Sequence, residues 1–448
     1  MRLTDVFKAY DIRGVVPDQL DADAMRRIGA AFAQVVGGPA FVVGHDMRPS
    51  SPELSAAFAD GVTSTGADVV AIGLASTDML YFASGHLDLP GAMFTASHNP
   101  AQYNGIKLCR AAARPISQAS GLTEIRELAG RGMPEPAATP GSVRTDDLLA
   151  AYAAYLADLV DISGIRPLRV AVDAANGMAG YTAPAVFGGT PVETVPLYFE
   201  LDGTFPNHEA NPLEPANLRD LQALVRDSGA DCGLAFDGDA DRCFVVDERG
   251  EPVSPSALTA LIATRELARE PGSTVIHNLI TSRAVPEIVR EHGGVPLRTR
   301  VGHSFIKAEM ASTGAIFGGE HSAHFYFRDF WFADSGMLAA LHLLAALGRY
   351  DGTLSGLMAE FDRYASSGEV NSTVTDQEAT LAAVERAFGT RDGATLDRLD
   401  GLTVEGPDWW FNVRPSNTEP LLRLNVEAPD EERMSKLRDE VLTVIRTA

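Results

Sequence analysis

The chain has 448 residues, of which 45% are hydrophobic and 22% charged, the composition of a globular protein with about two to four domains. The formal net charge of −23 argues against non-specific nucleic-acid binding, and no apolar run approaches the roughly 18 residues of a membrane span. The chain begins without the apolar stretch of a signal peptide, and Cys109, Cys232 and Cys243 are too scattered for a disulfide framework. We therefore expect a cytoplasmic protein with reduced thiols.

A strand followed by a helix recurs three times along the chain. Strand patterns at 41–46 and 67–73 flank an amphipathic segment at 52–65. The second repeat has a strand within 168–177, a helix that starts near Met178 and further strands within 230–247. The third has a strand within 274–283, a helix through Ile288 and a strand at 295–299. Alternating strands and helices favour βαβ units and mainly parallel sheets.

The C-terminal stretch has a different pattern. Residues 402–428 predict two strands around a polar loop, and residues 429–445 predict a helix with Asp430 as its N-cap. The apolar residues of that helix recur at helical spacing, at Met434, Leu437, Val441 and Ile445. We predict an antiparallel α+β domain here. With a Gly/Pro-rich linker at 130–141 and boundaries near 250–256 and 364–372, the predicted domains are 1–135, 142–250, 251–364 and 370–448.

The first segment that could carry chemistry is Thr95–Pro100, TASHNP, on a turn after an apolar strand. The Ser97 hydroxyl becomes a nucleophile only if a base, a metal or a cation activates it, and His98 and Lys107 lie nearby in sequence. The alternative is a plain turn, because Ser, Asn and Pro are turn residues.

The second segment places Asp237, Asp239 and Asp241 at every second position. Their carboxylates can converge on one cation, and oxygen ligands suit Mg²⁺ or Ca²⁺. An EF-hand is excluded because Arg242 stands where its loop requires glycine and the flanking residues are strand-like. The alternative is an exposed acidic turn.

The third segment, GGEHSAH at 318–324, follows another strand pattern. We expect Gly318 and Gly319 to allow a tight turn. Glu320 and Ser322 would point the same way in an extended chain and could contact sugar hydroxyls. The histidines lack the flanking glutamate of a helical zinc motif, and the alternative is a polar loop.

The fourth segment, RPSNTEP at 414–420 with Arg423 beyond it, combines arginines with neutral hydrogen-bond donors between two strands. Arginine makes bidentate contacts with phosphate, although a simple hairpin turn would also fit. Together the four segments supply a nucleophile, a cation site, residues that could bind sugar hydroxyls and residues that could bind phosphate. We call the last of these, Arg414 to Thr418 with Arg423, the phosphate grip. That combination predicts phosphoryl transfer on a polyol.

The order of these motifs, KAYDIRG at 8–14, then TASHNP, DGDADR, GEHSAH and RPSNTEP, resembles the α-D-phosphohexomutases, and in particular the bacterial phosphomannomutase/phosphoglucomutase branch. The resemblance covers essentially the whole chain. It implies an α/β fold with three similar mixed α/β domains plus a smaller C-terminal α+β domain around a central cleft.

By this resemblance Ser97 carries the phosphate, and its phosphoserine oxygen binds one Mg²⁺ together with Asp237, Asp239 and Asp241. Glu320 and Ser322 would read the sugar hydroxyls. The phosphate that is not transferred would be held by Arg414, Ser416, Asn417 and Thr418. Further active-site positions are matched by Tyr10, Arg13, His98, Lys107, Arg242, His303 and Arg423.

The implied reaction interconverts hexose 6-phosphate and hexose 1-phosphate, with mannose and/or glucose as the sugar and hexose 1,6-bisphosphate as intermediate and activator. His321 departs from the glutamine of phosphoglucosamine mutases and the second glutamate of strict phosphoglucomutases, and favours a phosphomannomutase-type loop. A phosphoglucosamine mutase, a metal-dependent sugar phosphatase and a non-catalytic sugar-phosphate binding protein are the alternatives. We expect a monomer or weak dimer without nucleic-acid or membrane partners.

Overall fold

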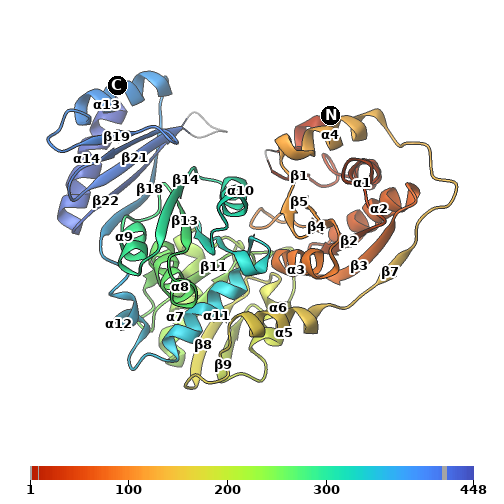
Figure 1. Cartoon of the computed structure of the whole chain (residues 1–448), viewed down its shortest axis with the longest axis horizontal. Coiled ribbons are helices and arrows are strands. Elements are labelled where there is room, and N and C mark those ends of the chain that lie inside the picture. The colour runs from red at the N-terminus through yellow and green to blue at the C-terminus, as the bar shows by residue number, and fades with distance from the viewer. Residues whose placement is uncertain (1–2, 9, 416–420, 448) are drawn as a thin grey trace. The chain divides into compact units, whose positions relative to one another are not determined.

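The computed structural model describes residues 3–8, 10–415 and 421–447, without the side chains of residues 3, 4, 303 and 304. The chain forms two compact units, one of Met1–Pro255 with Ser322–Leu357 and the other of Ser256–His321 with Met358–Ala448 (Figure 1). Within the described residues, none of the helices has both the length and the apolar character needed to cross a membrane.

The first sheet has the order β1-β5-β4-β2-β3-β7, with β6 paired to β5. Parallel pairing joins β4, β2, β3 and β7, whereas β5 runs antiparallel to β1 and β4. Its strands are β1 (Ile12–Val15), β2 (Ala40–His45), β3 (Asp68–Leu74), β4 (Gly91–Phe94), β5 (Tyr103–Arg110), β6 (Arg114–Pro115) and β7 (Val143–Thr145). Because β7 pairs with β3, the first residues of the segment predicted as a second domain extend the first sheet.

The helices of this sheet are η1 (Leu3–Val6), α1 (Ala22–Val36), α2 (Ser51–Ser64), α3 (Thr77–Leu87), η2 (Gln118–Ser120) and α4 (Leu122–Arg131). Asp21 and Ser76 cap α1 and α3 by accepting hydrogen bonds from backbone N–H groups of the first turn. Apolar side chains of α1, α2 and α4 pack on the sheet in one core, with Phe32, Phe58 and Phe94 among them. This packing fixes the strand ends from which the site loops emerge.

A second sheet, order β12-β11-β10-β8-β9, lies in the same unit. Its strands are β8 (Leu168–Asp173), β9 (Val192–Leu197), β10 (Cys232–Phe236), β11 (Cys243–Val246) and β12 (Pro252–Val253). The associated helices are α5 (Leu149–Leu159), α6 (Ala179–Phe187), η3 (Pro215–Leu218) and α7 (Arg219–Ser228). Strands β8, β9 and β10 are parallel, and β10 and β11 are antiparallel, so residues 237–242 join two neighbouring strands.

The third α/β segment contributes to both units. In the second unit, β14 and β15 flank β13 in parallel. The elements are α8 (Pro255–Arg269), β13 (Thr274–Asn278), α9 (Ala284–Glu291), β14 (Val295–Thr299), α10 (His303–Thr313) and β15 (Phe317–Gly319). In the first unit, β16 pairs antiparallel with β17, and the elements are β16 (Phe325–Phe327), η4 (Arg328–Phe330), β17 (Ala333–Asp334), α11 (Gly336–Leu347) and α12 (Leu354–Met358), whose last residue falls in the second unit.

The C-terminal sheet is wholly antiparallel, with the order β18-β22-β21-β20-β19. Its strands are β18 (Ala365–Thr373), β19 (Thr395–Asp397), β20 (Leu402–Glu405), β21 (Trp410–Pro415) and β22 (Leu421–Ala428). Helices α13 (Gln377–Phe388) and α14 (Glu431–Thr447) contact each other and share the core of this sheet. The predicted α+β domain is therefore confirmed.

Two details of the C-terminal prediction are confirmed and one is wrong. Asp430 accepts a hydrogen bond from the Arg433 N–H as the predicted N-cap, and the apolar residues predicted for α14 are buried. The described residues within 402–428, however, form three strands rather than two, because the chain reverses direction at residues 406–409. Strand β18 lies across the predicted boundary segment 364–372 and pairs along β22.

Candidate active site

The loop that carries Ser97 joins β4 to β5 in the first sheet. Ser97 is buried and has a φ of 49°, a left-handed conformation that is uncommon for a residue other than glycine. The Thr95 hydroxyl accepts a hydrogen bond of 2.9 Å from the Ser97 N–H. The predicted turn after a strand is thus present, with a backbone conformation often found at functional residues.

The aspartate loop, residues 237–242, joins β10 to β11. Asp237, Asp239 and Asp241 are all buried, and each offers a carboxylate oxygen within 4.8 Å of the others. A Cβ on Gly238 would lie 2.5 Å from the Ser97 carbonyl oxygen, so only glycine lets the two loops approach this closely. The alternative of an exposed acidic turn is therefore excluded.

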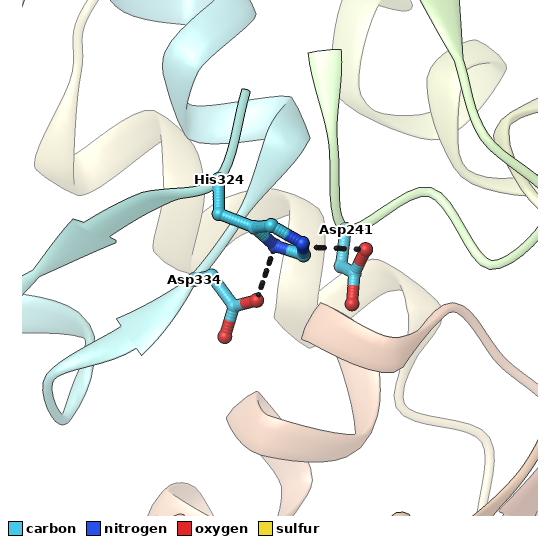
Figure 2. A group of neighbouring side chains, drawn as sticks. All are labelled: Asp241, His324 and Asp334. Atoms are coloured by element: carbon cyan, nitrogen blue, oxygen red, sulfur yellow. Dashed lines mark hydrogen bonds and ion pairs between the residues drawn. The ribbon is translucent and has the colours of Figure 1, made fainter. Parts of the chain in front are cut away.

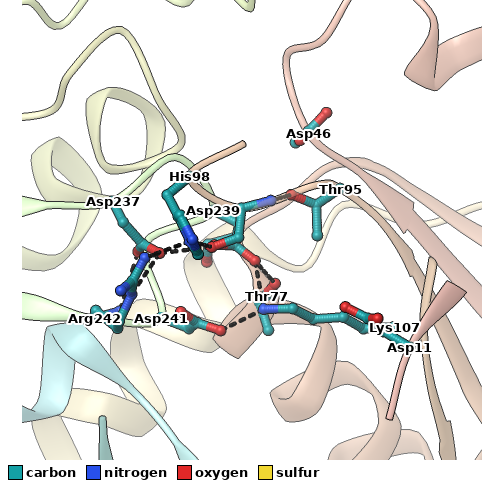
Figure 3. Close-up of polar contacts among 12 residues, drawn as sticks. Asp11, Asp46, Thr77, Thr95, His98, Lys107, Asp237, Asp239, Asp241 and Arg242 are labelled. Carbon is teal, nitrogen blue, oxygen red and sulfur yellow. Dashed lines mark hydrogen bonds and ion pairs between the residues drawn. The ribbon is translucent and has the colours of Figure 1, made fainter. Parts of the chain in front are cut away.

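Hydrogen bonds connect the two loops directly. The Ser97 Oγ donates to Asp237 Oδ2 at 2.8 Å, and Arg242 Nε donates to the same oxygen at 2.9 Å. Arg242 also donates through Nη2 to His98 Nδ1 at 2.7 Å (Figure 3). Since arginine is always a donor, His98 Nδ1 is the acceptor and carries no proton. Burial, with Arg242 close by, lowers the pKa of His98 to about 3, so the ring is neutral.

Lys107 on β5 lies between two of the carboxylates. Its Nζ is 2.6 Å from Asp239 Oδ2 and 2.5 Å from Asp241 Oδ2, and the Thr77 hydroxyl donates to Asp239 Oδ2 at 2.6 Å (Figure 3). Burial acts to lower the pKa of Lys107, but Asp239 and Asp241 raise it well above its ordinary value. Burial acts to raise the pKa of Asp239, yet Lys107 and Thr77 hold it below its ordinary value. Both groups are therefore charged at neutral pH.

The pKa of Asp237 is shifted in the opposite direction from that of Asp239. Burial raises its pKa to about 7, although Arg242 acts to lower it. Its Oδ2 already accepts the hydrogen bond from Ser97 Oγ, so this oxygen is placed to take that proton.

The aspartate loop also fits a divalent cation. Lys107 pairs with the Oδ2 atoms of Asp239 and Asp241, but their Oδ1 atoms are buried without a hydrogen-bond partner among the described residues. Buried acceptors without a partner are costly, and a cation would satisfy them. An all-oxygen set of three carboxylates suits Mg²⁺. These residues could therefore hold the metal predicted from the sequence.

His324 lies beside this loop, between Asp241 and Asp334. Its Nδ1 is 3.0 Å from Asp334 Oδ2 and 4.0 Å from Asp241 Oδ1 (Figure 2). Burial acts to lower the pKa of His324, but the two carboxylates raise it above its ordinary value. The backbone of His324 pairs with that of Arg242 as an isolated bridge, which fixes the ring beside the loop. Sequence reasoning assigned no role to His324 or Asp334.

The sugar-loop prediction needs two corrections. Gly318 and Gly319 lie inside β15 without positive φ, so they make no tight turn. A Cβ on Gly319 would lie 2.4 Å from Thr259 Oγ1, so this glycine serves close packing against α8. Residues 321–322 form a turn rather than extended chain, so the argument from alternating positions does not apply to Glu320 and Ser322. Glu320 is buried directly after β15.

Arg414 on β21 and Arg423 on β22 stand directly opposite each other in the C-terminal sheet. Both bind one carboxylate: Arg414 Nη2 is 2.7 Å from Glu369 Oε2, and Arg423 Nη1 is 3.2 Å from Glu369 Oε1. His321 lies in the same unit, and Glu369 and Arg414 both influence its pKa, which burial lowers. The two carboxylate oxygens of Glu369 thus occupy the position in which the arginines could bind a phosphate.

The remaining predicted residues differ in how far the structure describes them. Arg13 donates to Asn99 Oδ1 in the Ser97 loop and to Asp11 Oδ2 at 2.6 Å, and Tyr10 is half-buried. His303 begins α10, but its side chain lies outside the described residues, as do Ser416, Asn417 and Thr418 entirely.

Sequence reasoning also missed Arg48 and Thr77, which contact the Ser97 loop and the aspartate loop respectively. A signal for Arg48 was available. It follows the carboxyl end of a buried parallel strand, where α/β proteins commonly place functional residues.

Comparison with known families accounts for nearly the whole chain. Models of phosphoglucomutase/phosphomannomutase match as α/β/α domain I at residues 4–133, domain II at 150–250, domain III at 254–364 and the C-terminal domain at 369–444. The chain belongs to the phosphoglucomutase/phosphomannomutase family. The predicted class of three α/β domains with a distinct C-terminal domain is confirmed.

Individual relatives agree. The chain is 42% identical to a Xanthomonas campestris protein named phosphohexose mutases, over 98% of both chains. It is 38% identical to the phosphomannomutase of Escherichia coli K12, over 99% of both chains. A crystal structure of a phosphoglucomutase/phosphomannomutase family protein from Burkholderia thailandensis superposes with a TM-score of 0.90 at 35% identity, covering 100% of this chain and 99% of that one.

Proposed function

We propose that this protein is a phosphohexomutase that interconverts hexose 6-phosphate and hexose 1-phosphate through a phosphoserine at Ser97. The observation that carries the proposal is the 2.8 Å hydrogen bond from Ser97 Oγ to Asp237, at the edge of three buried carboxylates. It joins a nucleophile to a proton acceptor and a cation site within one unit. Membership in a family of hexose phosphate mutases supports the same reaction.

The residues of the first unit would act mainly by position and charge. When Ser97 Oγ accepts a phosphoryl group, the Oγ–P bond forms as the P–O bond to the sugar breaks. Asp237 Oδ2 is placed to take the Oγ proton, and the sugar oxygen leaves as an alkoxide that takes up one proton to become the free hydroxyl. Arg242 keeps Asp237 oriented and His98 neutral beside the serine. Mg²⁺ held by Asp237, Asp239 and Asp241 would neutralise charge on the phosphoryl group.

The second unit would bind the phosphate that is not transferred. Arg414 and Arg423 are the described residues of this grip, and Ser416, Asn417 and Thr418 would add neutral donors. Hexose 1,6-bisphosphate would act as intermediate and activator, since it can phosphorylate Ser97 at either turnover step. We expect the enzyme to work as a monomer or weak dimer.

The test begins with dephosphorylated enzyme, Mg²⁺ and glucose 1,6-bisphosphate, followed by peptide mapping by mass spectrometry. Phosphate at Ser97 is expected. A coupled assay then compares mannose 1-phosphate, glucose 1-phosphate and glucosamine 1-phosphate, and His321 favours the first two over the third. Release of inorganic phosphate as fast as isomerisation would show a sugar phosphatase instead, and no phosphate at Ser97 would contradict the mechanism.

A further inference from the structure

Arg48 is the most unusual buried residue near the site. It is among the largest side chains that are fully buried, and its guanidinium donates to four backbone carbonyls of one loop. Nη2 donates to Ser97 O at 2.9 Å and Asn99 O at 2.6 Å, and Nη1 donates to Pro100 O and Tyr103 O, both at 2.9 Å. One planar group thus binds the Ser97 loop from its nucleophile to the start of β5.

A buried cation of this kind is costly. Asp46 lies 3.3 Å from Arg48 Nε and provides the counter-charge, while its other oxygen accepts from the Arg48 N–H at 3.0 Å and the Ser51 hydroxyl at 2.6 Å. Replacing a buried ion pair by apolar residues is often neutral or stabilising, so stability alone does not explain this pair. A role in holding one particular conformation of the Ser97 loop explains why the pair is present.

Other groups contact the side chains of this loop. Arg13 donates to Asn99 Oδ1, Arg242 donates to His98 Nδ1, and Ser97 Oγ donates to Asp237, but none of these bonds reaches the loop backbone. Within it, the Asn99 N–H donates to Ala96 O, and the Ser97 N–H is bound by the Thr95 hydroxyl. Ser97 is nevertheless held at a φ of 49°. Four carbonyls directed at one guanidinium supply the constraint that such a conformation requires.

Residues of the connection between β9 and η3 close over the same arginine. The Phe205 ring centroid lies 5.1 Å from Arg48 Cζ, and a Cβ on Gly203 would lie 2.5 Å from Arg48 Cα. The Ser97 carbonyl that Arg48 binds is also the atom closest to Gly238 of the aspartate loop. The position of Arg48 therefore bears on the spacing between Ser97 and Asp237.

We propose that Arg48 is a positioning residue for phosphoryl transfer, which fixes the Ser97 loop through four carbonyls so that Ser97 Oγ meets the aspartate loop. It acts through the backbone of the loop, and not by contact with the reacting atoms. The inference rests on the proposed role of Ser97 as the phosphate carrier. Misplacing a reacting group by about 1 Å can cost 100-fold in rate, which sets the size of the expected effect.

The test uses the full-length variants Arg48→Lys and Arg48→Met. Lysine keeps the charge but cannot reach four carbonyls with one planar fork, and methionine fills similar space without donors. We expect kcat, and the rate of Ser97 phosphorylation by glucose 1,6-bisphosphate, to fall by roughly 10-fold for lysine and 100-fold for methionine. KM and Mg²⁺ affinity should stay within about twofold, because the substrate grip and the carboxylates keep their own supports.

Arg110→Lys is the matched control, since Arg110 lies on β5 and donates to the exposed Ser120 carbonyl away from the loop. This control variant should leave kcat, the rate of Ser97 phosphorylation, KM and Mg²⁺ affinity unchanged. Folding is checked by calorimetry. If neither Arg48 variant folds, Phe205→Leu decides, with an expected loss of about threefold in the phosphorylation rate.

The outcomes separate the two proposals. Wild-type enzyme without phosphate at Ser97 would contradict the proposed function itself. Wild-type enzyme phosphorylated at Ser97, with folded Arg48 variants phosphorylated just as fast, would overturn the role of Arg48 alone. A parallel loss of Mg²⁺ affinity and phosphorylation would also overturn it, because it would show general damage to the fold, and so would an unchanged rate in Phe205→Leu when that variant decides.

Discussion

Ser97 and the three aspartates facing it are at most 5% exposed, whereas Arg414 and Arg423 keep 12% and 31% of their side chains exposed. The buried group is tied together by side chains from two sheets, including Lys107, Thr77 and Arg242. Among the described residues, the two arginines share one carboxylate partner, Glu369, on a third strand of their sheet.

This difference fits the two tasks that we propose for these regions, phosphoryl transfer at Ser97 and phosphate binding at the two arginines. Charges in a buried site interact strongly and need no rearrangement during the reaction, which suits groups that act on a transferred phosphoryl group. A grip that must bind and release a phosphate in each cycle needs contacts that exchange easily with solvent or a neighbouring carboxylate. Glu369 pairs with one Nη atom of each arginine, and a phosphate that binds there must displace it.

The largest expected effect tests the buried region directly. Ser97→Ala should reduce kcat by roughly 1,000-fold or more, because single nucleophile removals cost on that order in enzymes that form covalent intermediates. Turnover is measured with glucose 1,6-bisphosphate supplied, and circular dichroism checks the fold. More than a few per cent of wild-type turnover would show that Ser97 is not the main phosphate carrier.

The second prediction concerns Asp78 on α3, whose Oδ2 accepts from Tyr152 Oη at 2.7 Å and Ser335 Oγ at 2.6 Å. Burial raises its pKa to about 6, against these hydrogen bonds. A raised folded-state pKa gives stability that is complete below the unfolded value near 3.8 and is lost as pH rises through about 6. Relative to Asp78→Asn, wild-type protein should lose roughly 2 kcal/mol of unfolding free energy between pH 4 and pH 7. Urea denaturation of both proteins across this range measures the loss, and parallel curves would contradict it.

The third prediction sharpens the role of the aspartate loop. Asp239→Asn should weaken Mg²⁺ binding by roughly 100-fold, because the number of charged ligands tunes oxygen-ligand sites over several orders of magnitude. Folding should suffer less, since the change relieves repulsion among close carboxylates. Titration calorimetry measures the affinity. Asp231→Asn, which alters a carboxylate paired with Arg166 in the same sheet, is the control. Unchanged metal affinity in Asp239→Asn would remove this loop as the cation site.

The fourth prediction moves to the exposed region. Arg414→Ala should raise KM for hexose 1-phosphate and hexose 6-phosphate alike by roughly 30-fold, since a charge-assisted contact contributes about 2 kcal/mol. The mutase reaction should suffer more than hydrolysis of the phosphoserine. Steady-state kinetics in both directions measure the effect, with Arg391→Ala, an arginine of the same domain paired with Glu440, as control. A change for only one of the two substrates would contradict a shared phosphate grip.

The smallest expected effect concerns Glu369, the carboxylate that pairs with the two exposed arginines. Glu369→Gln removes the charge that competes with phosphate for the arginines and should lower KM by roughly threefold, because partly exposed ion pairs contribute about 0.5 to 1 kcal/mol. Glu440→Gln makes the matched change at the Arg391 pair and should leave KM as it is. A raised KM in Glu369→Gln would show that the carboxylate supports the grip instead of competing with it.

The sequence by itself determined where each motif lies in its local structure. Apolar runs on either side placed Ser97 after β4 and the aspartates between β10 and β11, and helical spacing placed the buried face of α14. It also indicated that three close carboxylates need a cation, which the partnerless oxygens of Asp239 and Asp241 support. These features depend on residues near one another in the chain, so a local pattern records them.

Only the tertiary structure decided which distant residues meet. Ser97 and Asp237 are 140 positions apart, and Lys107 and Asp239 are 132 apart, yet each pair is hydrogen-bonded. The carbonyl contacts of Arg48, the place of His324 beside Asp241 and the pairing of Glu369 with two arginines were equally hidden. The role predicted for Gly319 was wrong for the same reason, because its neighbour Thr259 lies far away in sequence, on α8. Periodicity reports which face of a strand or helix is buried, but the partner across that face is chosen by packing of the whole domain.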